Sequence, residues 1–267
     1  MSFLRGFSMI FLLGVVVTSL FFDNNVYAHE YPHPIHLLMP HSGSAGHRIE
    51  GLNCLSWRLA VETNNLQDWM VSKECQGYVG HYMMGSQYHK DCLAVTSAAY
   101  GYIKSLSLKN GRNNTWIFDI DETSLSNLPY YARPQVGFGV YPYNDTAFYE
   151  WQKEAKAPAI PAVLSFYKKL VRLGVKVIFL SGAQAELREP KERNMKNIGY
   201  HTWEKMILKE LSESHMKAVE YKSMHRTKLE EMGYTIIGNM GDQWSDLLGS
   251  HTGLRTFKLP DPMYYIG

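Results

Sequence analysis

Two aspartates separated by a single residue follow a short apolar segment near the middle of the chain. The segment is 116–118, and Asp119 and Asp121 come directly after it. An apolar run of this length, bounded by polar residues, predicts a buried strand. Because open α/β folds bind ligands at the carboxyl ends of parallel strands, both aspartates would face a ligand site. Carboxylates held this close repel each other, and a bound cation or protonation of one acid relieves the repulsion. The alternative is a solvated turn at the end of a strand.

Further polar side chains follow or adjoin predicted elements later in the chain. They are Ser181 and Gly182 after the apolar segment 175–180, Lys222 in the predicted helix 218–232, and Asp242 and Asp246 in a glycine turn after the apolar segment 234–237. Taken singly, each has an ordinary explanation as a cap, a solvated charge or a turn. If the strands are parallel, these groups can meet at one edge of the sheet.

These residue types suit the transfer of a phosphoryl group. A carboxylate can attack phosphorus and form an aspartyl-phosphate. A second carboxylate can protonate the leaving oxygen and then deprotonate a water. A hydroxyl, a lysine and backbone N–H groups can hold the phosphoryl oxygens. Three acidic side chains can seat Mg²⁺, which prefers oxygen ligands.

The order of the predicted elements favours an α/β fold. From residue 116 onward, apolar segments of strand length alternate with helical patterns, which indicates a parallel sheet with helices on both faces. Residues 53–105 have apolar residues at helical spacing and predict a helical segment beside this core. The aromatic-rich stretch within 124–160 lacks periodicity and predicts an inserted cap. Its aromatic side chains would line a substrate pocket or form a small core of their own.

The composition is that of a globular protein. The 267 residues are 45% hydrophobic and 19% charged, which provides for one large core. The net charge of +2 is too small to indicate a nucleic acid or an anionic membrane as partner.

The first 28 residues predict a secretory signal peptide. Arg5 precedes an apolar run over 7–22, and a small-residue cleavage site ends at Ala28. An uncleaved anchor is the alternative, because the apolar run is long for a signal peptide. After cleavage no remaining segment could span a membrane, and the mature chain would begin with an irregular arm over 29–50.

Secretion would expose the cysteines to an oxidising compartment. The three cysteines, Cys54, Cys75 and Cys92, allow at most one internal disulfide, for which we favour Cys54–Cys75. Asn113 and Asn144 each begin an N-glycosylation sequence.

The order and context of the polar motifs resemble the haloacid dehalogenase (HAD) superfamily. The stretch 119–123 matches its first motif, and Ser181, Lys222 and the stretch 241–246 match the second, third and fourth. The longer strings 116–123, 126–131 and 241–247, with an N-terminal segment in 54–65, look like the class B-like branch of plant acid phosphatases and vegetative storage proteins. The similarity covers roughly residues 50–267, so the expected domain is 51–267, with a Rossmann-like core and a cap at about 124–160.

The resemblance implies a role for each acidic residue of these motifs. Asp119 would be the nucleophile and a ligand of Mg²⁺. Asp121 would be the general acid and base, and its backbone carbonyl would reach the metal. Asp242 would bind Mg²⁺. Asp246 would not bind the metal and would instead hold the groups around it in place.

The resemblance also implies a phosphate-binding set, with one departure from the family pattern. Ser181, Gly182 and Lys222 would hold the phosphate. Relatives commonly have an arginine after the glycine of the second motif, but this chain has Ala183. We therefore expect phosphate binding to be retained and a nearby cationic contact to be lost.

Two functions are consistent with the resemblance. One is a secreted or vacuolar Mg²⁺-dependent acid phosphatase acting on small phosphomonoesters. The other is a vegetative storage protein, a nitrogen reserve with little or no activity. Some storage members lack the nucleophilic aspartate, so the presence of Asp119 favours an enzyme. A weaker third interpretation is a module that binds phosphoryl ligands without turnover. A homodimer is one assembly that is consistent with the sequence.

Overall fold

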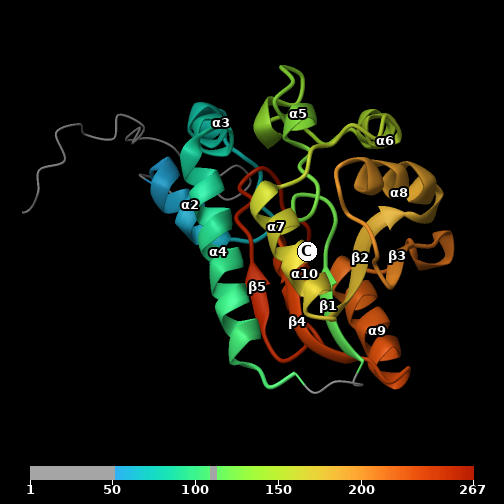
Figure 1. The fold of residues 1–267 in the computed structure, drawn as a ribbon. Coiled ribbons are helices and arrows are strands. Elements are labelled where there is room, and N and C mark those ends of the chain that lie inside the picture. Colours follow the sequence, from blue (N-terminus) through green and yellow to red (C-terminus); the bar gives the residue numbers. More distant parts are fainter. Residues whose placement is uncertain (1–51, 109–112) are drawn as a thin grey trace, which may run out of the picture. The chain divides into compact units, whose positions relative to one another are not determined.

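The computed structural model describes residues 52–108 and 113–267 (Figure 1). The expected signal peptide (1–28) and the expected irregular arm (29–50) lie outside the described residues. Among the helices of the described segments, none combines the length and the apolar character that a transmembrane span requires.

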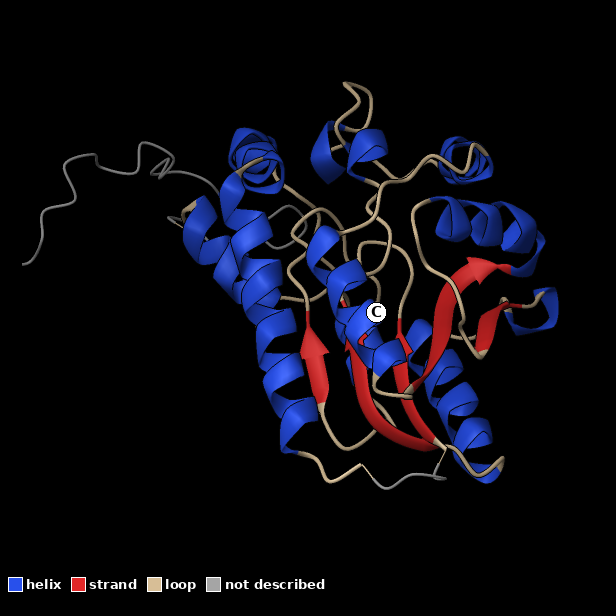
Figure 2. Ribbon diagram, in the orientation of Figure 1, coloured by secondary structure: helices blue, strands red, loops and turns tan. Residues whose placement is uncertain are grey.

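A sheet of five parallel strands lies at the centre of the fold (Figure 2). In the order in which they lie side by side, the strands are β3 (Lys205–Lys209), β2 (Lys176–Gln184), β1 (Asn114–Phe118), β4 (Thr235–Gly241) and β5 (Thr256–Lys258). The central strand β1 pairs with β2 on one side and with β4 on the other. The predicted α/β fold with a parallel sheet is confirmed.

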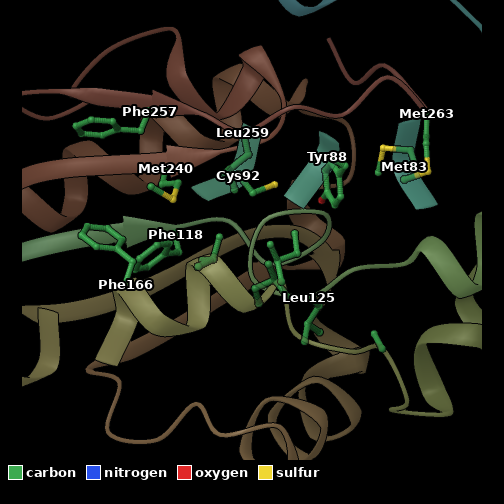
Figure 3. Packing of buried hydrophobic residues seen from close by; sticks show 14 of the residues in the cluster. Met83, Tyr88, Cys92, Phe118, Leu125, Phe166, Met240, Phe257, Leu259 and Met263 are labelled. Atoms are coloured by element: carbon green, nitrogen blue, oxygen red, sulfur yellow. The ribbon is translucent and has the colours of Figure 1, made fainter. Parts of the chain in front are cut away.

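Helices cover both faces of this sheet, because successive residues of a strand point to opposite faces. From β1, Trp116 and Phe118 pack in the large core beside α4 (Ser86–Ser105) and α7 (Pro161–Arg172). The ring centroids of Trp116 and Phe166 of α7 are 4.9 Å apart. Ile117 packs on the opposite face with Leu229 of α9 (Ala218–Glu231). Figure 3 shows Phe118, Phe166 and their neighbours in the large core.

Strand β4 is longer than the sequence predicted. We expected a glycine turn after residue 237, but the strand continues through Gly238 and ends at Gly241. A Cβ on Gly238 would lie 2.2 Å from the ring of Trp116, and one on Gly241 would lie 2.2 Å from the Asp246 carboxylate. These glycines therefore permit close approach within a strand and do not mark a turn.

Strand β2 also continues beyond its expected end at Ser181–Gly182. Gln184 pairs with Lys209 of β3 after a register shift that follows Leu180. The chain becomes helical only at η3 (Ala185–Leu187), which leads into α8 (Arg188–Asn197). Ser181 thus lies within an irregular part of the strand and not where a strand turns into a helix.

The expected helical segment before β1 is present as four elements. They are α2 (Cys54–Glu62), η1 (Lys73–Cys75), α3 (Gln76–Met84) and α4. Cys54 and Cys75 form a disulfide, with their Cα atoms 5.5 Å apart, and Cys92 is a buried free thiol. The bridge ties the start of α2 to η1, next to α3.

The segment between β1 and α7 lies beyond the carboxyl ends of the strands (Figure 1). It contains α5 (Leu128–Tyr131), η2 (Gly137–Gly139) and α6 (Asp145–Lys153). Its aromatic side chains serve both of the expected purposes. Tyr130 and Trp151 are buried and stack with their ring centroids 6.5 Å apart, whereas Tyr143, Phe148 and Tyr149 line a cavity.

Two short helical elements complete the described chain. They are η4 (Leu211–Glu213), between β3 and α9, and α10 (Trp244–Leu247), directly after β4.

Candidate active site

The carboxyl ends of the strands and the segment between β1 and α7 line a cavity of about 480 Å³. All seven residues that the sequence assigned to catalysis, phosphate binding or metal support line this cavity: Asp119, Asp121, Ser181, Gly182, Lys222, Asp242 and Asp246. They come from β2, α9, α10 and the loops after β1 and β4, so the parallel sheet brings together groups that are up to 127 residues apart in the chain (246 − 119).

Asp119 follows the last residue of β1 and is paired with a lysine. Its backbone N–H donates to the carbonyl of Met240 in β4 at 3.0 Å, which continues the sheet by one residue. Lys222 Nζ donates to Asp119 Oδ1 at 2.7 Å and also to Asp246 Oδ1. Burial raises the pKa of Asp119 well above its ordinary value, against the charge of Lys222, and the neighbouring acids raise it further. Burial lowers the pKa of Lys222, but the two carboxylates outweigh this effect and raise it.

Asp119, Asp242 and Asp246 form a buried group that could hold a cation. One carboxylate oxygen from each lies within 4.8 Å of those of the other two. Burial and the charges of Asp246 and Asp261 raise the pKa of Asp242 well above its ordinary value. Three buried carboxylates and a raised pKa at two of them suit a hard divalent cation such as Mg²⁺, which takes oxygen ligands.

The Asp242 and Asp246 carboxylates are held in place by several donors. Thr123 Oγ1 donates to Asp242 Oδ1 at 2.8 Å, and Gln243 Nε2 donates to Asp242 Oδ2 at 2.9 Å. The backbone N–H of Gln243 donates to Asp246 Oδ2 at 3.0 Å. Asp246 therefore accepts a hydrogen bond from this N–H with one oxygen and from Lys222 with the other. Because both oxygens already have donors, Asp246 suits a role in supporting the metal ligands better than a role as a ligand itself.

The Asp121 carboxylate is held by a set of partners different from those of Asp119, Asp242 and Asp246. Its Oδ1 accepts from Lys191 Nζ at 2.5 Å, from Asn127 Nδ2 at 2.8 Å and from Gln152 Nε2 at 3.4 Å. Burial raises the pKa of this carboxyl, but the charge of Lys191 and the three hydrogen bonds outweigh burial and lower it. Asp121 thus differs from its neighbour Asp119, whose pKa is raised.

Ser181 and Gly182 form the wall of the cavity on the β2 side. Ser181 is buried, and its Oγ accepts from the backbone N–H of Ala183 at 3.1 Å. Ala183 lines the cavity and brings no charge to it. The positively charged group that contacts Asp121 is instead the ammonium of Lys191, on α8.

Two further buried charged residues beside the cavity were not identified from the sequence. Glu122 is fully buried and accepts from the backbone N–H of Asn127 and from Ser126 Oγ. Its position inside the first motif was a signal, but we assigned the motif's chemistry to the two aspartates alone. Arg226 is also fully buried and donates to the carbonyl of Asp246 at 2.7 Å. Nothing in the charged sequence of α9 distinguishes Arg226 from a solvated arginine.

The predicted glycosylation residues lie outside this cavity. Asn113 is exposed just before β1, and its Nδ2 donates to the carbonyl of Gly233 at 3.3 Å. Asn144 is exposed and caps α6, where its Oδ1 accepts from the backbone N–H of Ala147 at 2.9 Å.

Comparisons with known proteins agree with this geometry. A family model described as HAD superfamily, subfamily IIIB (acid phosphatase), matches residues 41–267. The chain is 40% identical to acid phosphatase 1 of Solanum lycopersicum over 258 residues, which cover 96% of this chain and 99% of the relative. It is 46% identical to the stem 28 kDa glycoprotein of Glycine max, over 83% of this chain and 87% of the relative. It is 41% identical to vegetative storage protein 1 of Arabidopsis thaliana, over 80% of this chain and 79% of the relative.

A solved structure supports the fold. The class C acid phosphatase from Bacillus anthracis aligns with 71% of this chain and 85% of its own, with a TM-score of 0.59 at 20% sequence identity. The match to the family model covers most of the chain, and the match to acid phosphatase 1 covers 99% of that relative. The chain therefore belongs to the acid phosphatases of HAD subfamily IIIB.

Proposed function

We propose that the protein is a Mg²⁺-dependent acid phosphatase that hydrolyses small phosphomonoesters through an aspartyl-phosphate on Asp119. The observation that carries this proposal is the position of Asp119 at the end of β1, within the cavity, in contact with Lys222 and beside Asp242 and Asp246. A nucleophilic carboxylate needs positive charge around it when it approaches a phosphate dianion, and Lys222 together with a cation held by the carboxylates would supply that charge.

In the first step an oxygen of Asp119 attacks phosphorus, and the bond from phosphorus to the leaving oxygen breaks. Asp121 gives its proton to that oxygen, so the leaving group departs as a neutral alcohol. In the second step Asp121 takes a proton from a water, which attacks the phosphorus of the aspartyl-phosphate. The bond from phosphorus to Asp119 breaks, and inorganic phosphate is released.

Other side chains of the cavity hold the phosphoryl group during both steps. Lys222 and Ser181, with the backbone at Gly182, would contact the phosphoryl oxygens. Bound Mg²⁺ would supply positive charge that offsets the charge of these oxygens. Its proposed ligands are Asp119, Asp242 and the backbone carbonyl of Asp121.

The proposed domain is 51–267, with a cap insertion at about 124–160. The cap side of the cavity is lined by Tyr143, Phe148 and Tyr149, so the leaving group would lie against aromatic rings. This arrangement suits a small phosphomonoester, and binding would not require a second phosphate group on the substrate.

A role as a storage protein is the second candidate. It is supported by the relatives called vegetative storage proteins, which are 41% identical to this chain. A secretory signal peptide and an extracellular or vacuolar location are part of both proposals. The stem glycoproteins among the relatives support this location.

The experiment that tests the proposal measures phosphate release from p-nitrophenyl phosphate by residues 29–267. The assay is run from about pH 4 to 8, with Mg²⁺ and with a chelator. We expect turnover that depends on Mg²⁺ and is greatest at acid pH, because Asp121 must be protonated for the first step. A folded, metal-loaded protein without turnover would overturn the phosphatase proposal and leave storage as the leading account.

N-glycosylation is expected at Asn144 and not at Asn113. The glycan is attached to Nδ2, and the cap of α6 uses only Oδ1 of Asn144. At the other sequence, Asn113 Nδ2 donates to Gly233, and Thr115 is fully buried in β1. Peptide mapping after enzymatic deglycosylation in heavy-oxygen water checks this, since each released glycan leaves a labelled aspartate. A label at 113 with none at 144 would contradict the expectation.

A further inference from the structure

We infer that Lys191 is a positioning residue that anchors one oxygen of Asp121 and so presents the other oxygen to the reacting groups. The inference rests on the proposed function, because it assigns Lys191 a part in the proton transfers of Asp121. Neither the motifs nor the family resemblance pointed to Lys191, which lies in a charged stretch of α8.

The contacts of the Asp121 carboxylate are one-sided. Lys191, Asn127 and Gln152 all donate to Oδ1, at 2.5, 2.8 and 3.4 Å. No described residue donates to Oδ2. The side chain of Asp121 is 16% exposed and lines the cavity. Three donors on one oxygen fix the plane and direction of the carboxylate, and the other oxygen stays available for a proton.

Lys191 is well suited to act through Asp121 and not on the substrate. Its side chain is only 3% exposed, and it is not among the residues that line the cavity. Its one described ion pair is with Asp121 Oδ1. A buried ammonium is costly unless it is paired, so the position of this lysine is tied to the position of the carboxylate.

The other two donors connect the same carboxylate to the cap. Gln152 lies on α6, and Trp151 of α6 donates from Nε1 to Asn127 Oδ1 at 2.9 Å. Asn127 therefore receives a hydrogen bond from α6 and donates one to Asp121. Lys191 supplies the anchor from the core side, on α8, which packs beside α6.

A residue that merely joined α8 to the loop after β1 would affect folding but would not act specifically through Asp121. The two roles differ in a double-mutant cycle. If Lys191 works by positioning Asp121, its removal has no kinetic effect once Asp121 has lost its acid–base function. A purely structural residue would still change the activity in that background.

The test compares Lys191→Met, Lys191→Arg, Asp121→Asn and the double variant K191M/D121N. Methionine keeps the length of the side chain and removes its charge. Lys196→Met is the matched control, because Lys196 is an exposed lysine on the same helix. Each variant is measured for kcat and KM with p-nitrophenyl phosphate and with an alkyl phosphate, and for its melting temperature with and without Mg²⁺.

We expect K191M to lower kcat with the alkyl phosphate by about 10²-fold, within the range of general acid–base contributions, with little change in KM. K191R is expected to stay within about tenfold of the wild type, because it retains a charged donor. K191M/D121N is expected to match D121N in kcat within about twofold, and to melt at a higher temperature than D121N. The higher melting temperature would follow because D121N leaves the buried Lys191 without its carboxylate.

The inference is overturned if K191M keeps wild-type kcat, or if it lowers kcat further in the D121N background. A wild-type protein without any turnover would overturn the proposed function instead. In that case the melting temperatures still test the ion pair between Lys191 and Asp121. A double variant no more stable than D121N would overturn the ion pair, and a more stable double variant would support it.

Discussion

Asp119→Asn is expected to lower kcat for p-nitrophenyl phosphate by at least about 10⁴-fold, because an amide oxygen is a far weaker nucleophile than a carboxylate. The substitution is nearly isosteric, so the fold should be retained. It also removes one charge from a group in which Asp119, Asp242 and Asp246 repel one another. Lys222 keeps Asp246 as a partner, so in the presence of a chelator the loss should appear in kcat with little change in thermal stability. Stopped assays with labelled substrate and an acid quench check the mechanism directly, since the wild type should retain label on the protein and D119N should not.

The control for Asp119→Asn is Asp91→Asn. Asp91 is a carboxylate on α4 that pairs with Arg58 at 3.6 Å and accepts from Tyr82 at 2.8 Å, outside the cavity. Its replacement removes a paired carboxylate without touching the proposed chemistry, so kcat should stay within about twofold of the wild type. If D119N kept more than about one hundredth of wild-type kcat while folded, the nucleophile would have to be another group, and the aspartyl-phosphate mechanism would be wrong.

The parts of the site that the sequence predicted are those fixed by short-range pattern. Residues 116–118 form an apolar run whose strand assignment needs no knowledge of the rest of the chain. Once the parallel sheet was inferred from the alternation of elements, the groups at 119, 181, 222 and 242 could be expected to meet at one edge. The structure brings all of them to one cavity.

The extent of the strands could not be predicted in the same way. Gly238 and Gly241 look like turn residues in the sequence, because glycine is common in turns. Their role depends on Trp116 and on Asp246, whose side chains occupy the space a Cβ would fill. Trp116 is 122 residues from Gly238 in the chain (238 − 116), so no local pattern indicates that contact.

Buried charges were missed for a related reason. Lys191 and Arg226 both lie in charged helices, where a solvated position is the usual one. Their burial follows from tertiary contacts, with Asp121 in one case and with the carbonyl of Asp246 in the other. The sequence shows that Ala183 brings no positive charge. It does not show that the ammonium group of Lys191 on α8 contacts Asp121.

Removal of the metal is expected to make the stability of the protein fall as pH rises from about 5 to 7. Asp119 and Asp242 have raised pKa values, because burial and neighbouring acids disfavour their charged forms. Between the ordinary carboxyl pKa and the raised one, the folded protein holds more protons than the unfolded chain, so the free energy of unfolding decreases with pH. Glu122 and Asp261 shift in the same direction. Asp121 shifts in the opposite direction, but its stabilising contribution is lost only at pH values below this window.

Mg²⁺ should reverse this trend, because a cation offsets the repulsion and competes with protons for the carboxylates. At about 100 times its dissociation constant, a ligand that binds only the folded state stabilises by about 2.7 kcal/mol. For a chain of this size that corresponds to a rise in Tm of about 5–11 °C. Differential scanning fluorimetry at several pH values, with chelator and with Mg²⁺, measures both effects. The rise should be larger at pH 7 than at pH 5.

Asp242→Asn separates the metal site from the other buried acids. It removes one of the three clustered carboxylates, so the chelated protein should lose less stability between pH 5 and 7, and the shift with Mg²⁺ should largely disappear. Asp261→Asn is the matched control, because Asp261 is also buried with a raised pKa and also bonds Gln243, but it is outside the cluster. Its variant should flatten the same pH dependence and keep the shift with Mg²⁺. A wild-type shift in D242N, or its loss in D261N alone, would mean that the cation binds elsewhere than among Asp119, Asp242 and Asp246.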